Sequence, residues 1–409
     1  MSVLSLSAHP PATLALFCKV VDNFGDIGIC WRLARQLHAE NAVAVTLWVD
    51  DLLTFARICP QVDVHAATQQ VAGVHVRHWV DNDGAFASSD VADTVIEFFG
   101  VDLPPAYIAA MAQCTPRPVW LNLEGMSAEA WVEGCHTLPS THPRLPLVKH
   151  FFFPGFTAQT GGLLRERDLA ASRLRFQADP GASAALLSDL GLSAAEQAAF
   201  KVSLFCYPHA PVTALFAAWQ AGATPIAALV PHGVAADAVS AFLGAPAVPG
   251  AQRTRGALSV RVLPLLPQPD YDRLLWACDL NFVRGEDSIV RAQWAGRPFV
   301  WHIYPQDENL HHVKLRAFLQ RFSPALEAAN DFSLRWNDVL APAADQAQIG
   351  VDEPLPDWPA AWQRYHAAID ASTARLQQWQ AELVAHGDLA SNLLRFAETV
   401  RASNRSAHQ

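Results

Sequence analysis

Short apolar segments of strand length alternate with helical segments twice along this chain, and this rhythm limits the folds that it can adopt. The first series begins at residue 13 with TLALFCKVV, IGICWRLARQLHAE and AVAVTLWVD. The second begins at residue 201 with KVSLFCYP, VTALFAAWQAG and TPIAALVP. Strands that alternate with helices form βα units around a mostly parallel sheet. The sequence therefore predicts an α/β protein with two such sheets.

The length of the chain and an irregular segment in its middle predict where the two domains divide. The 409 residues suit two domains of roughly 200 residues each. The stretch HTLPSTHPRLPLVKHFFFPGF, with four prolines, interrupts the alternation, and from residue 356 onward only helical periodicity remains. We therefore expect an N-terminal domain over 1–165, a C-terminal domain over 166–355, and helices over 356–409 that pack back across both domains.

Charge and cysteine usage exclude several classes of protein. The net charge is −10 and no basic run occurs, which disfavours binding to nucleic acid or to an anionic membrane surface. The apolar start of the chain has no basic n-region and ends at Asp22, so it predicts neither a signal peptide nor a membrane span, and we expect a cytoplasmic protein. The seven cysteines form no CxxC pair, which favours reduced, packed thiols, and no zinc-binding spacing is present.

The motif DNFGDIG, residues 22–28, follows the first predicted strand and carries more polar side chains than a turn requires. One interpretation is local: Asp26 caps a helix that begins near Ile27, and Asp22 starts the turn. One helix start needs one cap, however, and the motif offers Asp22, Asn23 and Asp26 together. The glycines match neither a GxGxxG fingerprint nor a P-loop. The surplus of polar groups therefore favours a functional role at this strand end.

A second motif, VRGEDSIVRAQWAG at residues 283–296, places an arginine and two acids at the start of another helix. Arg284 can hold a phosphate by paired hydrogen bonds, and a helix expected to begin near Ser288 would offer backbone N–H groups to the same anion. This combination suits a diphosphate. Glu286 and Asp287 would then turn toward sugar hydroxyls or a cationic acceptor. The alternative is a surface network of Arg284 with these acids, in which Asp287 is the N-cap.

Other polar or aromatic residues follow the remaining strands of the second series. Tyr207, Gln268 and Tyr304 each come after an apolar run. Because the carboxyl ends of parallel strands meet at one edge of a sheet, these residues and the 284–288 loop are suited to a base and a sugar diphosphate. For Tyr207 alone, core packing is the alternative. We expect His311 and His312 on a solvated helix face.

Three long segments resemble one known family. DNFGDIGICWRLARQL, LWACDLNFVRGEDSIVRAQWAG and PFVWHIYPQ resemble the bacterial protein-arginine rhamnosyltransferases that modify translation elongation factor P, and the likeness spans nearly the whole chain. The resemblance implies a GT-B glycosyltransferase of two facing Rossmann-like domains. It implies transfer of L-rhamnose from dTDP-β-L-rhamnose to one arginine of elongation factor P, with inversion and without a metal or cofactor. The modification would activate the factor for ribosomes stalled at polyproline.

The resemblance also assigns roles to residues. In this family the C-terminal domain holds the nucleotide sugar and the N-terminal domain meets the acceptor. Asp26 corresponds to the proposed base with Asp22 beside it, and Glu286 corresponds to a second catalytic acid. Leu265 stands where relatives have an aromatic residue. The implied substrate-binding residues are Asn23, Phe24, Gly25, Tyr207, Gln268, Arg284, Gly285, Asp287, Ser288 and Tyr304.

Three other functions fit two α/β domains. A two-lobed binding protein is usually exported, which the missing signal peptide disfavours. A sugar epimerase would have a glycine-rich NAD turn after its first strand, and DNFGDIG is not one. A GT-B transferase with a small-molecule acceptor stays open, because no composition or spacing identifies a protein arginine as the acceptor.

Overall fold

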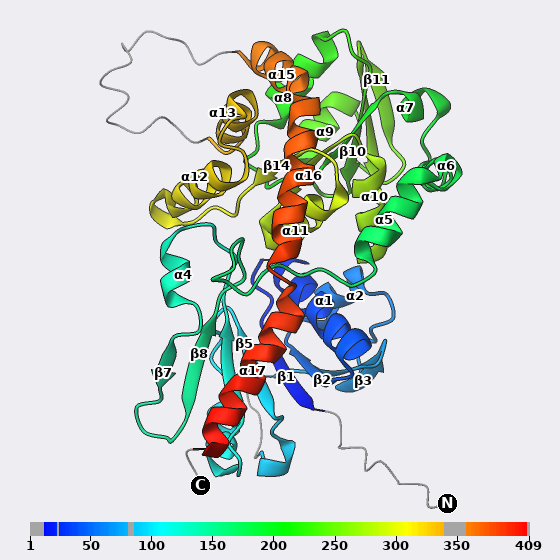
Figure 1. Ribbon diagram of the computed structural model, residues 1–409. Coiled ribbons are helices and arrows are strands. Elements are labelled where there is room, and N and C mark those ends of the chain that lie inside the picture. The colour runs from blue at the N-terminus through cyan, green and yellow to red at the C-terminus, as the bar shows by residue number, and fades with distance from the viewer. Residues whose placement is uncertain (1–11, 23, 81–85, 339–356, 407–409) are drawn as a thin grey trace, which may run out of the picture. The chain divides into compact units, whose positions relative to one another are not determined.

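The computed structural model describes residues 12–22, 24–80, 86–338 and 357–406, and the chain forms two compact units (Figure 1). Unit 1 comprises Met1–Met126, Trp131–Glu166 and Gly387–Gln409. Unit 2 comprises Ser127–Ala130 and Arg167–His386. The helices predicted over 356–409 are thus divided between the units at His386, and this segment does not form a part of its own.

Unit 1 is built on a sheet whose central strands are parallel. Its strand order is β3-β4-β2-β1-β5-β6-β8-β7, and only the edge pairs β3/β4 and β7/β8 are antiparallel. The central strand β1 buries five of its six residues, as expected for a parallel strand covered on both faces. The strand bounds are β1 Thr13–Cys18, β2 Ala44–Val49, β3 Thr68–Val71, β4 Val74–His78, β5 Thr94–Phe98, β6 Val119–Leu123, β7 Pro139–Thr141 and β8 Val148–Phe152.

Helix α17, Leu389–Ser406, completes unit 1 although it lies at the far end of the sequence (Figure 1). Its residues Leu393 and Ala397 are fully buried, and it contacts α1 and β6. Gln36 of α1 donates through Nε2 to Asp388 Oδ1 over 3.0 Å, which ties α1 to the start of α17. The other helices of unit 1 are α1 Phe24–Asn41, α2 Leu52–Ile58, η1 Ser88–Asp90, α3 Pro105–Gln113 and α4 Trp131–Cys135.

Unit 2 has a second sheet, in the order β11-β12-β10-β9-β13-β14, that is parallel except for the edge pair β11/β12. The strands are β9 Phe200–Leu204, β10 Ile226–Pro231, β11 Gln252–Arg255, β12 Leu258–Leu263, β13 Leu280–Arg284 and β14 Phe299–His302. The helices are α5 Leu169–Ala178, α6 Pro180–Asp189, α7 Ala194–Ala198, α8 Val212–Ala221, α9 Ala236–Leu243, α10 Gln268–Ala277, α11 Gly285–Ala295, η2 Asp307–Asn309, α12 Leu310–Phe322, α13 Glu327–Trp336, α15 Trp358–Ala367 and α16 Ile369–Ala385.

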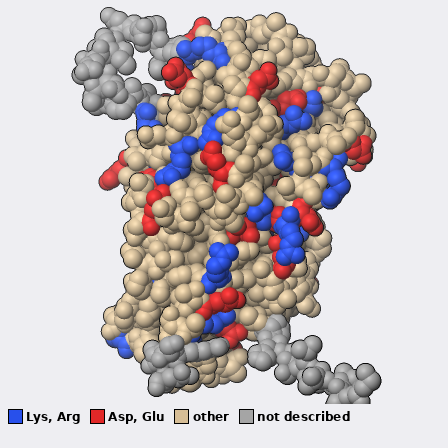
Figure 2. Space-filling view, viewed as in Figure 1, with Lys and Arg blue, Asp and Glu red and all other residues tan. Residues whose placement is uncertain are grey.

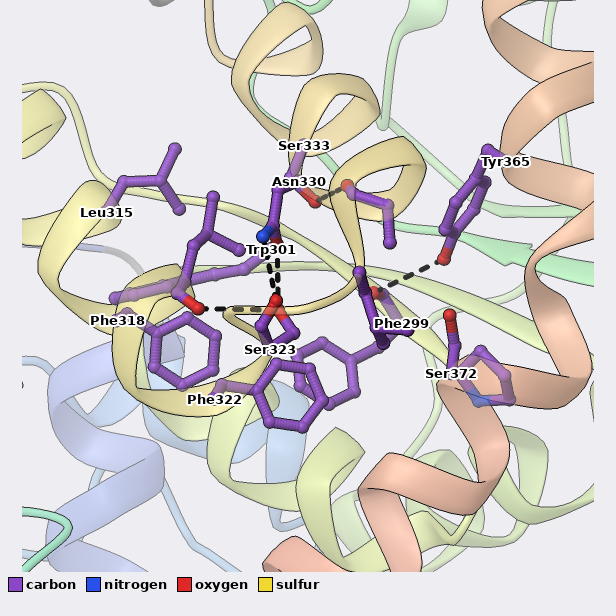
Figure 3. A pocket seen from close by; sticks show the side chains of 14 residues that line it. Phe299, Trp301, Leu315, Phe318, Phe322, Ser323, Asn330, Ser333, Tyr365 and Ser372 are labelled. Atoms are coloured by element: carbon purple, nitrogen blue, oxygen red, sulfur yellow. Dashed lines mark hydrogen bonds between the residues drawn. The ribbon is translucent and has the colours of Figure 1, made fainter.

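Aromatic side chains pack α13 and α15 against the sheet of unit 2. Phe332 stacks on Tyr365 with ring centroids 4.7 Å apart, and Trp336 meets Phe282 of β13 edge to face. Beside this cluster a cavity of about 20 Å³ lies under α12, roughly the space for one water molecule (Figure 3). Its wall includes Ser323, whose Oγ donates to Asn330 over 2.7 Å. The helical layer is therefore closely packed.

The structure confirms the predicted α/β class and the two parallel-rich sheets. All seven cysteines are free thiols, as predicted. Among the described residues, no helix is long and apolar enough to cross a membrane. Figure 2 shows acidic and basic side chains interspersed over the visible face of the molecule.

Candidate active site

Asp26 of unit 1 lies just beyond the carboxyl end of β1 and is almost completely buried. Its Oδ2 accepts the backbone N–H groups of Val21 and Asp22 over 2.7 and 2.8 Å. Helix α1 begins at Phe24, so Asp26 is the third helical residue and reaches back to the turn. The expected helix start near Ile27 and the N-cap position of Asp26 are therefore wrong. The two donors stabilise negative charge on Oδ2 and fix the carboxylate.

Asp22 is more accessible than Asp26 and sits over a glycine. The N–H of Gly25 donates to the Asp22 carbonyl over 2.8 Å, closing a turn. A Cβ placed on Gly25 would lie 3.2 Å from Asp22 Oδ2, so glycine leaves room for that carboxylate. Phe24 is half-buried beside them, and Asn23 lies outside the described residues. Unit 1 thus presents one buried and one accessible carboxylate after the same strand.

In unit 2 the loop after β13 is a tight strand-to-helix turn. Arg284 is the N-cap residue of α11, and Gly285 has a φ of 66°, a conformation that favours glycine. Ser288 Oγ accepts the Arg284 N–H over 3.1 Å and donates to the Arg284 carbonyl. Helix α11 therefore begins at Gly285 rather than near Ser288, and Asp287 is not its N-cap.

The guanidinium of Arg284 is held by aromatic faces and a carbonyl. Its Cζ lies 4.4 Å from the ring centroid of Phe205 and 4.9 Å from that of Tyr207. Nη1 donates to the carbonyl of Cys206 over 3.0 Å. Arg284 makes no ion pair with any described residue. The alternative of an Arg284–acid surface network is therefore wrong, and its positive charge remains available to an anion at the N-terminus of α11.

The two acids of the loop each have a different partner. Glu286 Oε1 accepts from Lys314 Nζ of α12 over 2.8 Å. Asp287 Oδ2 accepts from Nε2 of Gln268, the first residue of α10, over 3.4 Å. Gln268 is almost completely buried. The two acids thus contact groups contributed by two different helices, α12 and α10.

Aromatic rings and histidines surround Arg284 at the ends of β9 and β14. The rings of Tyr207 and Tyr304 meet edge to face at 5.7 Å, with Tyr207 buried and Tyr304 44% exposed. The buried position of Tyr207 agrees with the core-packing alternative, and Tyr304 offers an open ring. His302 Nε2 lies 3.0 Å from His209 Nε2. Burial lowers the pKa of His302 to about 3 and also lowers the pKa of His209.

Sequence reasoning missed Phe205, His209, His302 and Lys314. His209 and His302 lie within FCYPH and HIYPQ, two residues from Tyr207 and Tyr304 respectively, and this proximity is the signal that could have indicated them. The expectation that His311 lies on a solvated face is wrong, because its side chain is buried and Nδ1 accepts the Gln306 N–H over 3.1 Å.

The predicted residues therefore fall into two sets. Tyr207, Gln268, Arg284–Ser288 and Tyr304 gather at the carboxyl edge of the sheet of unit 2, as the parallel topology requires. Asp22 and Phe24–Asp26 lie at the corresponding edge of unit 1. Among the described residues no group of three or more His, Cys, Asp or Glu side chains could hold a metal ion.

Comparison with known proteins gives consistent results. The family model for the elongation factor P (EF-P) rhamnosyltransferase EarP matches residues 14–398. A protein-arginine rhamnosyltransferase of Pseudomonas putida is 48% identical over 94% of this chain and 98% of its own. That of Pseudomonas aeruginosa is 44% identical with the same coverage.

Solved structures extend this likeness to the fold. A structure that explains EarP-mediated arginine glycosylation of translation elongation factor EF-P matches with a TM-score of 0.63 and 33% identity, covering 95% of this chain and 99% of that one. A glycosyltransferase of Rickettsia africae has a TM-score of 0.50 at 8% identity, over 96% of this chain and 99% of its own, and shares the fold alone. The fold is that of the GT-B glycosyltransferases.

Proposed function

Since the chain belongs to the EarP family and is a protein-arginine rhamnosyltransferase, we propose that it transfers L-rhamnose from dTDP-β-L-rhamnose to an arginine of elongation factor P, with inversion. Membership of a family of EF-P rhamnosyltransferases, and the likeness to the EarP structure, support elongation factor P as the acceptor. The observation that carries the donor assignment is Arg284, a cation without a carboxylate partner among the described residues, at the N-terminus of α11.

The donor is held by unit 2. The diphosphate accepts from Arg284 and from the backbone N–H groups of Gly285 to Ser288, which supply positive charge where the leaving group develops its negative charge. Tyr304 offers its open ring, while Tyr207 and Gln268 line the same edge. Glu286 and Asp287, which contact Lys314 and Gln268, are proposed to face the sugar and the acceptor. This arrangement requires no metal or cofactor.

The acceptor meets the carboxylates of unit 1. A guanidinium is a poor nucleophile because its charge is delocalised and its pKa exceeds about 12. Asp22 and Asp26 orient it by charge-assisted hydrogen bonds. One guanidinium nitrogen then forms a bond to the anomeric carbon, the bond from that carbon to the phosphate oxygen breaks, and dTDP leaves with the electron pair. The proton lost by the nitrogen passes to a carboxylate, for which we propose Asp26 with Glu286 as the second catalytic acid.

The experiment is intact mass of purified elongation factor P after incubation with this protein and dTDP-β-L-rhamnose. We expect a gain of one deoxyhexose located on an arginine, and no gain with Asp26→Asn. Calorimetry should show that Asp26→Asn retains donor binding while Arg284→Ala loses it. Arg273→Ala, which removes an exposed arginine of α10, is the matched control.

Two results would contradict parts of this proposal. Equal donor binding by wild type and Arg284→Ala would refute the diphosphate assignment. Donor binding without any mass gain on elongation factor P would favour the second candidate, a transferase with a small-molecule acceptor. Because the proposed acceptor is a translation factor, we also propose a cytoplasmic location for the enzyme.

A further inference from the structure

We propose that unit 1 contains a second anion-binding site, specific for a phosphate or phosphate-monoester group, in a cavity at the amino ends of its central strands. The cavity has a volume of about 360 Å³ and lies beside the start of β5 and β6. Its wall includes Asp93, Arg117, Arg401 of α17, and the hydroxyl-bearing residues Ser88, Ser89 and Thr115.

This cavity is separate from the carboxylates proposed to act in catalysis. Asp26 follows the carboxyl end of β1, whereas Asp93 is bonded to Thr13, the first residue of that strand. Six residues of β-strand span about 20 Å, so the two places lie at opposite edges of one sheet. No step proposed for rhamnosyl transfer uses the cavity.

Two guanidinium groups in the wall have unmet hydrogen-bonding capacity. The Nε atoms of Arg117 and Arg401 are buried, and neither has a hydrogen-bond partner among the described residues. Arg401 Nη2 donates to Thr94 Oγ1 over 2.5 Å, which fixes that side chain while leaving Nε unmatched. A buried donor without an acceptor is costly, more so on a charged group. Both arginines line the cavity, so an oxyanion there can pair with their guanidinium groups.

The charge of the wall selects the ligand class. Asp93 is the one acidic residue among the described residues of the wall. Its Oδ2 already accepts hydrogen bonds from the N–H and the Oγ1–H of Thr13, each over 2.8 Å. Because two arginines and one carboxylate line the cavity, the net charge of its described wall is positive. Guanidinium forks pair two parallel N–H groups with two oxygens of one anion, and a phosphate offers enough oxygens for two forks. The volume also admits the organic part of a small monoester.

The test is calorimetric titration with inorganic phosphate at constant ionic strength, using the full chain. We expect saturable binding that persists in Arg284→Ala, which removes the proposed diphosphate contact of unit 2. Binding should weaken at least tenfold in Arg117→Gln and in Arg401→Gln. The control is Arg395→Gln, which replaces an exposed arginine of the same helix α17 and should leave phosphate affinity unchanged within twofold.

Folding of the variants is checked independently, because Arg401 bonds to buried Thr94. Arg117 makes no side-chain hydrogen bond to another described residue, so Arg117→Gln tests the site even if Arg401→Gln fails to fold. Phosphate should raise the Tm of wild type relative to chloride, and this rise should vanish in Arg117→Gln. Phosphate binding equal in wild type and Arg117→Gln, loss of all binding in Arg284→Ala, or acetate binding as tight as phosphate would each overturn the proposal.

Discussion

The backbone N–H of Tyr207 donates to Nδ1 of His302 over 3.1 Å, joining the segment after β9 to the last residue of β14. Because Nδ1 accepts, the ring proton of His302 is on Nε2, which donates to Nε2 of His209 over 3.0 Å. Both rings are therefore neutral in this arrangement. These two hydrogen bonds fix the backbone of Tyr207. The guanidinium of Arg284 packs against the ring of the same residue.

We expect this neutral His302 to make stability depend on pH. Burial lowers its pKa in the folded protein to about 3, against about 6.5 when unfolded, so the unfolded chain binds more protons between these values. The contribution of neutral His302 to the free energy of unfolding is therefore fully present above pH 6.5, and it is lost as the pH falls from 6.5 toward 3. Denaturant titrations give the free energy of unfolding at pH 7 and at pH 5. Between these pH values it should fall by about 2 kcal/mol more in wild type than in His302→Gln. Equal losses in the two proteins would contradict neutral burial of His302.

Lys314→Met should impair catalysis without unfolding the protein. Lys314 Nζ lies 2.8 Å from Glu286 Oε1, and Lys314→Met removes this ion pair and so changes the position and charge environment of the carboxylate. We expect kcat for rhamnosyl transfer to fall roughly tenfold, with donor affinity changed less. Lys201→Met, which breaks a 2.9 Å ion pair with Asp279 at the amino end of β9, is the matched control and should keep wild-type kcat. Similar kcat values for both variants would argue against a role for the Lys314–Glu286 pair.

Gly25→Ala should displace the accessible carboxylate of unit 1. The new Cβ would stand 3.2 Å from Asp22 Oδ2, so the carboxylate must shift by a few tenths of an ångström. We expect turnover of elongation factor P to fall about tenfold while the free energy of unfolding changes by less than about 1 kcal/mol. Gly134→Ala, where a Cβ meets no atom within 4 Å, provides the comparison. Unchanged turnover in Gly25→Ala would remove Asp22 from the acceptor site.

A buried ion pair joins the two helices whose first residues line the donor site. Arg291 of α11 donates through Nε and Nη2 to the two oxygens of Asp272 of α10, over 3.1 and 2.7 Å. Asp272→Ala removes both of these charge-assisted hydrogen bonds from a buried guanidinium, and should cost about 3 to 5 kcal/mol of unfolding free energy. The double variant Asp272→Leu, Arg291→Met should recover most of this loss in denaturant titrations. If Asp272→Ala and the double variant lose the same amount of unfolding free energy, the charges of Asp272 and Arg291 are themselves required for stability.

Local patterns predicted the strands of both sheets and the edges at which polar residues gather, because burial and parallel topology act along short segments. They misplaced the start of α11, since the left-handed Gly285 lets the helix begin before the acids. They misplaced Asp26 because a carboxylate at the third helical position can reach back to the turn. The contacts of His302 with His209 and of Lys314 with Glu286 join residues far apart in sequence, which periodicity does not report.

Helix α17 belongs to the unit that starts the chain, and this has a consequence for the order of events on the ribosome. Synthesis runs from the amino end, so all of Arg167–His386 emerges before the segment that supplies Leu393 and Ala397 to the core of unit 1. The sheet of unit 2 can close while that of unit 1 still exposes the apolar surface that α17 covers. The half of the enzyme that is translated first is therefore the half that finishes folding last.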